Sequence, residues 1–290
     1  MLLNPVTIHA PTSLAQAIDL HANLDNAKLQ AGGTFLLNSL KLLKRKGMKT
    51  PDHIISLRKV GELKGIAREG GQLIIKSMTT ITELLESPLL TDHLSVLKIV
   101  AKNISTNPIR NMATVGGNLT CRYTWTEMPA VMIGLDAQLH FEGTNGEREV
   151  LDAEDFFTKA AKTDKIFTHA SITIDPGVSV VYRRVKKTPN VDIPLLSLLI
   201  KTNFEDGRFT NTKVGINNCV TFAQRDVTLE NFLNESVCGE NTAADALNHL
   251  TESIYDNRSS DYKKHVFRTS IKSAVGELIN RHTLYDNTNN

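Results

Sequence analysis

The sequence reads AGGTFLL at residues 31–37 and ATVGGNL at residues 113–119. Each stretch sets an adjacent glycine pair beside a threonine and apolar residues. The first stretch follows a predicted strand at 28–31 and precedes a predicted helix with leucines at 36, 37, 40 and 43 on one face. Glycine permits positive φ and lets another group approach the backbone closely. The two pairs are therefore either separate turns or two halves of one ligand site.

A strand, a glycine loop and a helix in this order bring unpaired main-chain N–H groups to the positive end of the helix dipole. Phosphate and diphosphate groups are typical ligands of such loops. Two loops facing each other would hold a diphosphate from both sides. Neither stretch continues as a GK[ST] phosphate loop, and neither fits the GxGxxG pattern of Rossmann domains. A third pair, Gly70-Gly71, lies between two predicted strands and is predicted to be an ordinary hairpin turn.

The pattern around these loops predicts an α+β protein. Residues 1–55 form a predicted β-α-β unit, and residues 56–174 combine hairpins with short helices, one of them opened by a Thr80–Glu83 capping box. After a break at residues 175–177, strand-like runs are followed by helical stripes to residue 282. We therefore expect a domain at 1–174, with subdomains of about 1–55 and 56–174, and a C-terminal domain at 178–284 with an antiparallel sheet and a helical bundle.

Composition excludes several classes of function. The chain has 290 residues, 41% of them hydrophobic and 22% charged, which is typical of a folded globular protein. A net charge of +2 and 6% aromatic residues do not favour binding to nucleic acid or to an anionic membrane. The start of the chain lacks the pattern of a secretory signal, and no apolar run reaches the roughly 18–20 residues of a spanning helix.

The residue types that bind metals are scattered. Three cysteines, Cys121, Cys219 and Cys238, form no CxxC pair, and the nine histidines form no HExxH motif. We expect no metal site and no iron–sulfur cluster held by this chain. Unpaired, scattered cysteines are typical of a reducing compartment, so the predicted location is the cytoplasm.

Three stretches taken together resemble a known family. They are AKLQAGGTFLL (27–37), IRNMATVGGNL (109–119) and RRVKKTPNVDIPLLSL (183–198). The resemblance is to the FAD-binding subunit of molybdenum hydroxylases, the flavoprotein or medium subunit of xanthine dehydrogenase and aerobic carbon monoxide dehydrogenase. It runs from about residue 4 to about residue 280. It implies the vanillyl-alcohol-oxidase-type FAD fold, with FAD held non-covalently between the first two subdomains.

The resemblance also implies the residues of the cofactor site. Main-chain N–H groups of the first motif would bind the pyrophosphate from Ala31, Gly32, Gly33, Thr34, Phe35 and Leu36. The second motif would cover the other side of the pyrophosphate and reach the flavin through Thr114, Gly116, Gly117 and Asn118. Glu127 stands where relatives carry an acidic residue for the polar linker of the cofactor. Lys187 and Asp192 lie in the segment that approaches the flavin in relatives.

Two features leave alternatives open. Arg110, just before the second motif, is predicted either to pair with phosphate or to cap a turn. Phe35 replaces a small or polar residue of the family, and the segment TCRYTWTEMPA (120–130) differs from a shorter stretch in relatives. These departures keep a cofactor-free scaffold of the same fold as an alternative.

The function implied is electron transfer, with no catalytic residue predicted in this chain. The implied partners are a subunit with a molybdenum cofactor and a subunit with iron–sulfur clusters, and the implied electron acceptor is NAD or oxygen. The other alternative is a self-contained flavin oxidoreductase.

Overall fold

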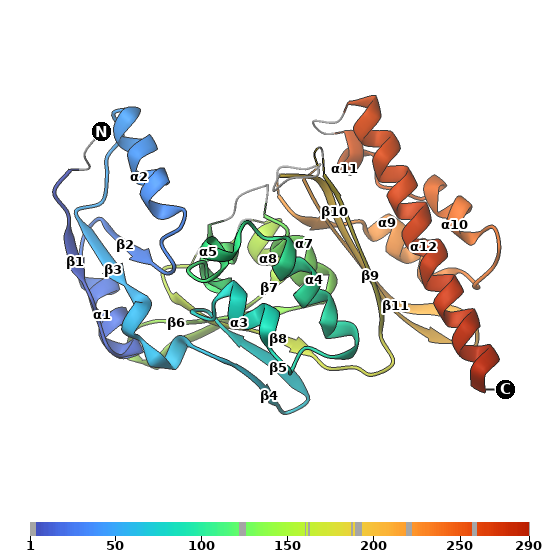
Figure 1. The fold of residues 1–290 in the computed structure, drawn as a ribbon, viewed down its shortest axis with the longest axis horizontal. Coiled ribbons are helices and arrows are strands. Elements are labelled where there is room, and N and C mark those ends of the chain that lie inside the picture. Colours follow the sequence, from blue (N-terminus) through green and yellow to red (C-terminus); the bar gives the residue numbers. More distant parts are fainter. Residues whose placement is uncertain are drawn as a thin grey trace.

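The computed structural model describes residues 4–121, 126–159, 161, 163–186, 188, 193–218, 222–256 and 260–289. Three sheets follow one another along the chain and across the molecule, with the N-terminal sheet at one end and the long C-terminal helix at the other (Figure 1). Lys187 and Asp192 lie outside the described residues.

The first sheet is parallel and has three strands in the order β1-β3-β2. The strands are β1 (Thr7–His9), β2 (Ala27–Gln30) and β3 (His53–Ser56), and the connecting helices are α1 (Leu14–Asn23) and α2 (Leu36–Arg45). Ala17 and Ile18 of α1 belong to a small apolar cluster that also includes Met78, just after β5 (Gln72–Lys76), and Ile166 at the start of β8 (Ile166–Thr173). The predicted β-α-β unit at 1–55 is therefore present.

Helix α2 ends where the sequence predicts. Gly47 has φ +67°, and the N–H groups of Gly47 and Met48 donate to the carbonyls of Lys44 and Leu43. This pair of bonds is the Schellman motif, which favours glycine at the left-handed position.

The second sheet is antiparallel, in the order β4-β5-β8-β6-β7. Its strands are β4 (Ile66–Glu69), β5 (Gln72–Lys76), β6 (Gln138–Glu142), β7 (Arg148–Asp152) and β8 (Ile166–Thr173). Gly70 and Gly71 have φ of +56° and +76°, and a Cβ on either would meet no atom within 4 Å. The third glycine pair is thus the plain hairpin turn that was predicted.

Short helices precede or connect the strands of this sheet along the chain. They are η1 (Leu57–Lys59), η2 (Gly61–Leu63), α3 (Ile81–Glu86), η3 (Asp92–Ser95), α4 (Val96–Asn103), α5 (Asn107–Arg110), α6 (Val115–Thr120), α7 (Met128–Gly134), η4 (Thr144–Gly146) and α8 (Ala153–Phe157). The predicted capping box is confirmed at the start of α3, where Thr80 and Glu83 bond each other's main-chain N–H groups.

The third sheet is antiparallel in the order β12-β11-β10-β9, and helices cover one of its faces (Figure 1). The strands are β9 (Ser179–Lys186), β10 (Pro194–Glu205), β11 (Arg208–Asn217) and β12 (Gln224–Arg225). The helices are α9 (Val227–Glu235), α10 (Thr242–Asp245), η5 (Ala246–Asn248), α11 (Glu252–Asp256) and α12 (Asp261–Asn289). The boundary between β8 and β9 lies at the predicted break, while the domain limits themselves stay a prediction.

The third sheet packs directly on α7 of the middle segment. A Cβ on Gly215 would lie 2.0 Å from the Ala130 carbonyl oxygen, and one on Gly134 would lie 2.5 Å from a methyl carbon of Leu199. Leu199 belongs to the apolar core of the middle segment. Because strand and helix backbones meet this closely, residues from all three sheets can line one cavity.

Two histidines form a stacked pair on the second sheet. His140 on β6 and His169 on β8 are opposite each other, with ring centroids 4.1 Å apart and planes at 9°. Burial, together with the charges of His140, Lys76 and Arg148, lowers the pKa of His169 to about 4. Burial also lowers the pKa of His140. Both rings are therefore neutral in the folded protein near neutral pH.

We predict that this pair makes the fold acid-sensitive. The folded-state pKa of His169 lies below the ordinary value of 6.5, so protons bind the unfolded chain preferentially and stability falls as pH drops from 6.5 to about 4. His169→Gln should flatten this fall, measured as the urea midpoint at each pH. Equal slopes for the variant and the wild type over that range would contradict the assignment.

Candidate functional site

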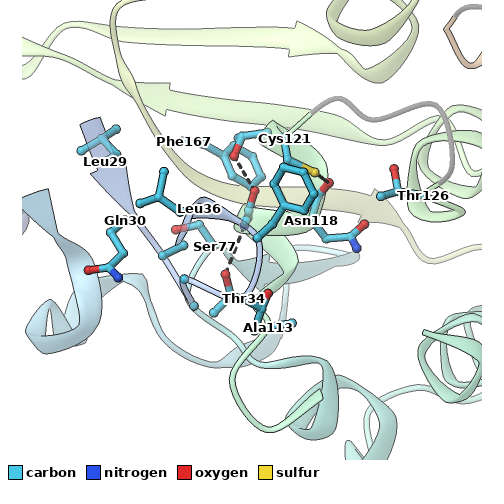
Figure 2. A pocket seen from close by; sticks show the side chains of 18 of the residues that line it. Leu29, Gln30, Thr34, Leu36, Ser77, Ala113, Asn118, Cys121, Thr126 and Phe167 are labelled. Carbon is cyan, nitrogen blue, oxygen red and sulfur yellow. Dashed lines mark hydrogen bonds between the residues drawn. The ribbon is translucent and has the colours of Figure 1, made fainter. Parts of the chain in front are cut away.

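A cavity of about 1050 Å³ is lined by residues of the first sheet and the middle segment (Figure 2), and also by Arg184 and Pro194 of the third sheet. Ligand pockets of drug-sized molecules usually have roughly 300–1,000 Å³, so this cavity is large enough for a bigger ligand. Most of the predicted site residues line it: Ala31, Gly32, Gly33, Thr34, Phe35, Leu36, Thr114, Gly116, Gly117, Asn118 and Glu127. The two glycine motifs therefore do meet at one cavity.

The first loop contacts the second through backbone. A Cβ on Gly32 would lie 1.9 Å from the carbonyl oxygen of Met112, a separation that no side chain tolerates. A Cβ on Gly117 would lie 3.3 Å from the Cβ of Ala31. The first glycine of the pair is thus required by loop-to-loop packing, and the second, Gly33, by its φ of +73°.

The first loop has main-chain N–H groups that make no main-chain hydrogen bond. In the described part of the chain, the N–H groups of Gly32, Gly33 and Thr34 donate to no main-chain carbonyl. Helix α2 begins directly after them, and Phe35 at its N-cap position makes no side-chain capping bond. Unpaired N–H groups at a helix N-terminus bind anions. This loop has the properties predicted for a phosphate-binding loop.

The second loop differs from the prediction of a facing anion loop. The N–H of Val115 donates to the Thr79 carbonyl, that of Gly116 to the Ser77 carbonyl, and that of Asn118 to the Thr114 carbonyl, at 2.8–2.9 Å. The N–H of Gly117 donates to the Thr114 hydroxyl at 3.1 Å. Because these N–H groups already bond within the protein, they are not open donors like those of the first loop, and a contact of this loop with a diphosphate stays a prediction. What this loop offers the cavity is side chains.

Gly116 of the second loop also has a packing role. A Cβ on Gly116 would lie 2.7 Å from both the Cβ and the carbonyl oxygen of Ser77. Helix α6 can therefore sit against the chain that leaves β5 only if this position is glycine. The sequence pattern indicated close approach correctly, but the group that approaches is protein and not ligand.

Arg110 is a structural residue. Its Nη1 donates to the carbonyls of Lys102, Ile104 and Ser105 at 2.9–3.1 Å. These carbonyls lie at the C-terminal end of α4, where a cation and its hydrogen bonds are favourable. Arg110 does not belong to the described lining of the cavity. Of the two alternatives, these hydrogen bonds favour the cap, and a contact of Arg110 with the cofactor stays a prediction.

Glu127 lines the cavity but is held by an ion pair. Arg184 Nε donates to its Oε1 at 2.5 Å, and the side chains are 8% and 4% exposed respectively. The hydroxyl of Tyr182 donates to the other carboxylate oxygen. Burial and the neighbouring carboxylate raise the pKa of Tyr182 well above its ordinary value. Glu127 thus joins the start of α7 to β9 at the cavity wall.

The lining includes two buried polar side chains: Ser77, which the sequence did not indicate, and Asn118, which it did. Ser77 is 3% exposed, and its hydroxyl has no hydrogen-bond partner among the described residues. Asn118 Oδ1 is likewise buried without a partner there. Both side chains are seen among those lining the cavity in Figure 2. Buried polar atoms are nearly always hydrogen-bonded, so an acceptor-rich and donor-bearing ligand fits this cavity.

The described residues were compared with two other features, a metal site and a membrane-spanning helix. These contain no group of three or more histidine, cysteine or acidic side chains that could hold a metal ion. Their helices include none that is long and apolar enough to cross a membrane.

Unpaired N–H groups at a helix start and a large cavity between sheets are typical of proteins that bind a diphosphate-containing cofactor. The chain belongs to the family described as FAD binding domain in molybdopterin dehydrogenase, whose profile matches residues 4–173. Its cofactor is FAD, and the predicted family and cofactor are confirmed.

Relatives of this chain include subunits of two dehydrogenases. The carbon monoxide dehydrogenase medium chain of Hydrogenophaga pseudoflava is 37% identical over 150 residues, or 51% of this chain and 50% of that relative. The match thus spans half the length of that relative. The xanthine dehydrogenase FAD-binding subunit of Escherichia coli O157:H7 is 26% identical over 286 residues, covering 93% of this chain and 95% of that one.

A solved structure gives the same fold. In the carbon monoxide dehydrogenase from Hydrogenophaga pseudoflava that lacks the Mo-pyranopterin moiety, one chain matches with a TM-score of 0.85 and 25% identity. The match covers 95% of this chain and 98% of that chain. The predicted α+β fold class is confirmed.

We predict that Glu127→Gln destabilises the protein by about 3 kcal/mol, because it removes the buried carboxylate charge that pairs with Arg184. Urea unfolding measures this loss, and adding Arg184→Met should restore part of it. Asp155→Asn, which removes an exposed ion pair with Lys159, is the control and should leave stability unchanged. Unchanged stability of Glu127→Gln would contradict the assignment.

Proposed function

We propose that this chain is the FAD-bearing electron-transfer subunit of a molybdenum hydroxylase complex. One partner subunit carries a molybdenum cofactor and hydroxylates the substrate, and a second passes on single electrons through iron–sulfur clusters. An acceptor such as NAD or oxygen is reduced at this chain. Relatives named as medium chains and medium subunits support such an assembly.

The observation that carries this proposal is the cavity that both glycine motifs line, with free main-chain donors on the first loop only. The first loop would bind the cofactor's diphosphate through the N–H groups of Gly32, Gly33 and Thr34. Thr114 and Asn118 would contact the cofactor through their side chains. Gly116 and Gly117 would bring these side chains within reach by packing closely on Ser77 and Ala31.

The remaining proposed residues position the cofactor. Phe35 and Leu36 form an apolar wall beside the first loop, and Ile193 and Pro194 contribute to the lining at the start of β10. Glu127 would fix the cavity wall through Arg184 and also present its carboxylate edge to the cofactor. Lys187 and Asp192 stay predictions. Bound FAD supplies the redox chemistry, in which both one-electron and two-electron transfers are available.

Purification tests this function directly. We expect protein with the visible absorption of oxidised flavin, or colourless protein that takes up added FAD, and recovery together with subunits that carry molybdenum and iron–sulfur centres. A protein that takes up no FAD would contradict the cofactor function. A flavoprotein that oxidises a small molecule without partners would contradict the electron-transfer role and favour a self-contained oxidoreductase.

We predict that Gly33→Ala weakens FAD binding at least about tenfold, because a side chain at φ +73° distorts the donor loop and its Cβ would lie 2.9 Å from Gln30 Nε2. Fluorescence titration with FAD measures the change. Gly47→Ala, at φ +67° beyond the other end of α2, is the matched control. It carries similar backbone strain and should leave FAD affinity unchanged. Equal affinities of the two variants would contradict the role of this loop.

A further inference from the structure

Ser77 is a buried serine whose hydroxyl has no role among the described residues. It follows β5 (Gln72–Lys76), is 3% exposed and lines the cavity (Figure 2). Within the part of the chain that the structure describes, its hydroxyl has no hydrogen-bond partner. A buried hydroxyl without a partner destabilises a folded protein, so a ligand that completes it gains binding free energy.

The backbone of Ser77 fixes where this hydroxyl lies. Its N–H donates to the Thr168 carbonyl, and its carbonyl accepts from the Gly116 N–H, both at 2.8 Å. Gly116 packs so closely on Ser77 that a Cβ there would lie 2.7 Å from the serine Cβ. With its main chain bonded on both sides, Ser77 has only its side chain left for a ligand.

The position of Ser77 points to one part of the cofactor. Its neighbour Gly116 belongs to the second loop, whose next residue, Gly117, contacts Ala31 at the start of the first loop. The free donors of the first loop come directly after Ala31. On the side of the second loop, the main-chain N–H groups are already used. On the side of the second loop, the Ser77 hydroxyl is a donor that can still bond a phosphate.

We propose that Ser77 is a cofactor-binding residue whose hydroxyl donates a hydrogen bond to a phosphate oxygen of the FAD diphosphate. It takes the place of the main-chain donors that the second loop has committed to its own packing. The inference rests on the cofactor function proposed above and assigns one more residue to it. Hydrogen bonds from neutral donors to charged oxygens are among the stronger ones, so the loss of this one should be measurable.

The test compares Ser77→Ala with the wild type in two binding titrations and one unfolding experiment. FAD and ADP are the probes, since they share the diphosphate and only FAD carries the flavin. We expect Ser77→Ala to bind both about tenfold more weakly. We also expect the cofactor-free variant to melt at the same or a higher temperature, because it has lost a hydroxyl without a partner.

Ser171→Ala is the matched control. Ser171 is 2% exposed on β8, and its hydroxyl is bonded to His140 Nε2 at 2.8 Å. This variant should melt at a lower temperature and bind FAD and ADP as the wild type does.

Three results would overturn the inference on Ser77. They are unchanged FAD affinity in Ser77→Ala, weaker FAD binding with ADP binding unchanged, and weaker binding together with a lower melting temperature of the cofactor-free protein. Failure of the wild type to bind FAD would overturn the cofactor function and this inference with it. Equal binding by wild type and Ser77→Ala would overturn the inference alone.

Discussion

The contact between Gly32 and the Met112 carbonyl is the constraint on which the site depends. A Cβ at residue 32 would lie 1.9 Å from that oxygen, so the two loops can meet only with glycine there. The contact joins the first sheet to the middle segment at one side of the cavity. On the other side, the Glu127–Arg184 pair joins the middle segment to the third sheet. Three sheets thereby surround one cavity.

The two loops differ in the main-chain donors that they leave open to a ligand. In the second loop, the N–H groups of Val115, Gly116 and Asn118 donate to main-chain carbonyls of the protein. These hydrogen bonds hold the loop in place at the cavity. The first loop leaves its N–H groups open at the start of α2. A diphosphate bound there would complete the hydrogen bonding of the loop and interact with the helix dipole. The stability of this part of the fold is then linked to occupancy by the cofactor.

Local signals in the sequence predicted local structure well. The strand-to-helix order around AGGTFLL, the hairpin at Gly70-Gly71, the capping box at Thr80 and the stop at Gly47 depend on residues close in sequence, and each is present in the structure. The resemblance of three separate stretches predicted the family and the cofactor. Residues from all three stretches line one cavity.

The hydrogen-bond and ion-pair partners of the polar groups could not be predicted from local sequence signals. Gly116 donates to a carbonyl at residue 77, and Glu127 pairs with Arg184, partners far apart in the chain. Arg110 is fixed by carbonyls at the end of α4, whose position follows from tertiary packing. Sequence spacing shows which residues can approach a ligand, whereas the hydrogen bonds already made within the fold decide which of them still have a free donor.

Hydrogen exchange of individual amides, with and without FAD, tests the unequal roles of the two loops most directly. The account predicts that the amides of Gly32, Gly33 and Thr34 exchange rapidly in the cofactor-free protein and become protected when FAD binds. The amides of Val115, Gly116 and Gly117 should be protected already and change little. Rapid exchange at residues 115–117 that FAD suppresses, with no change at residues 32–34, would contradict it.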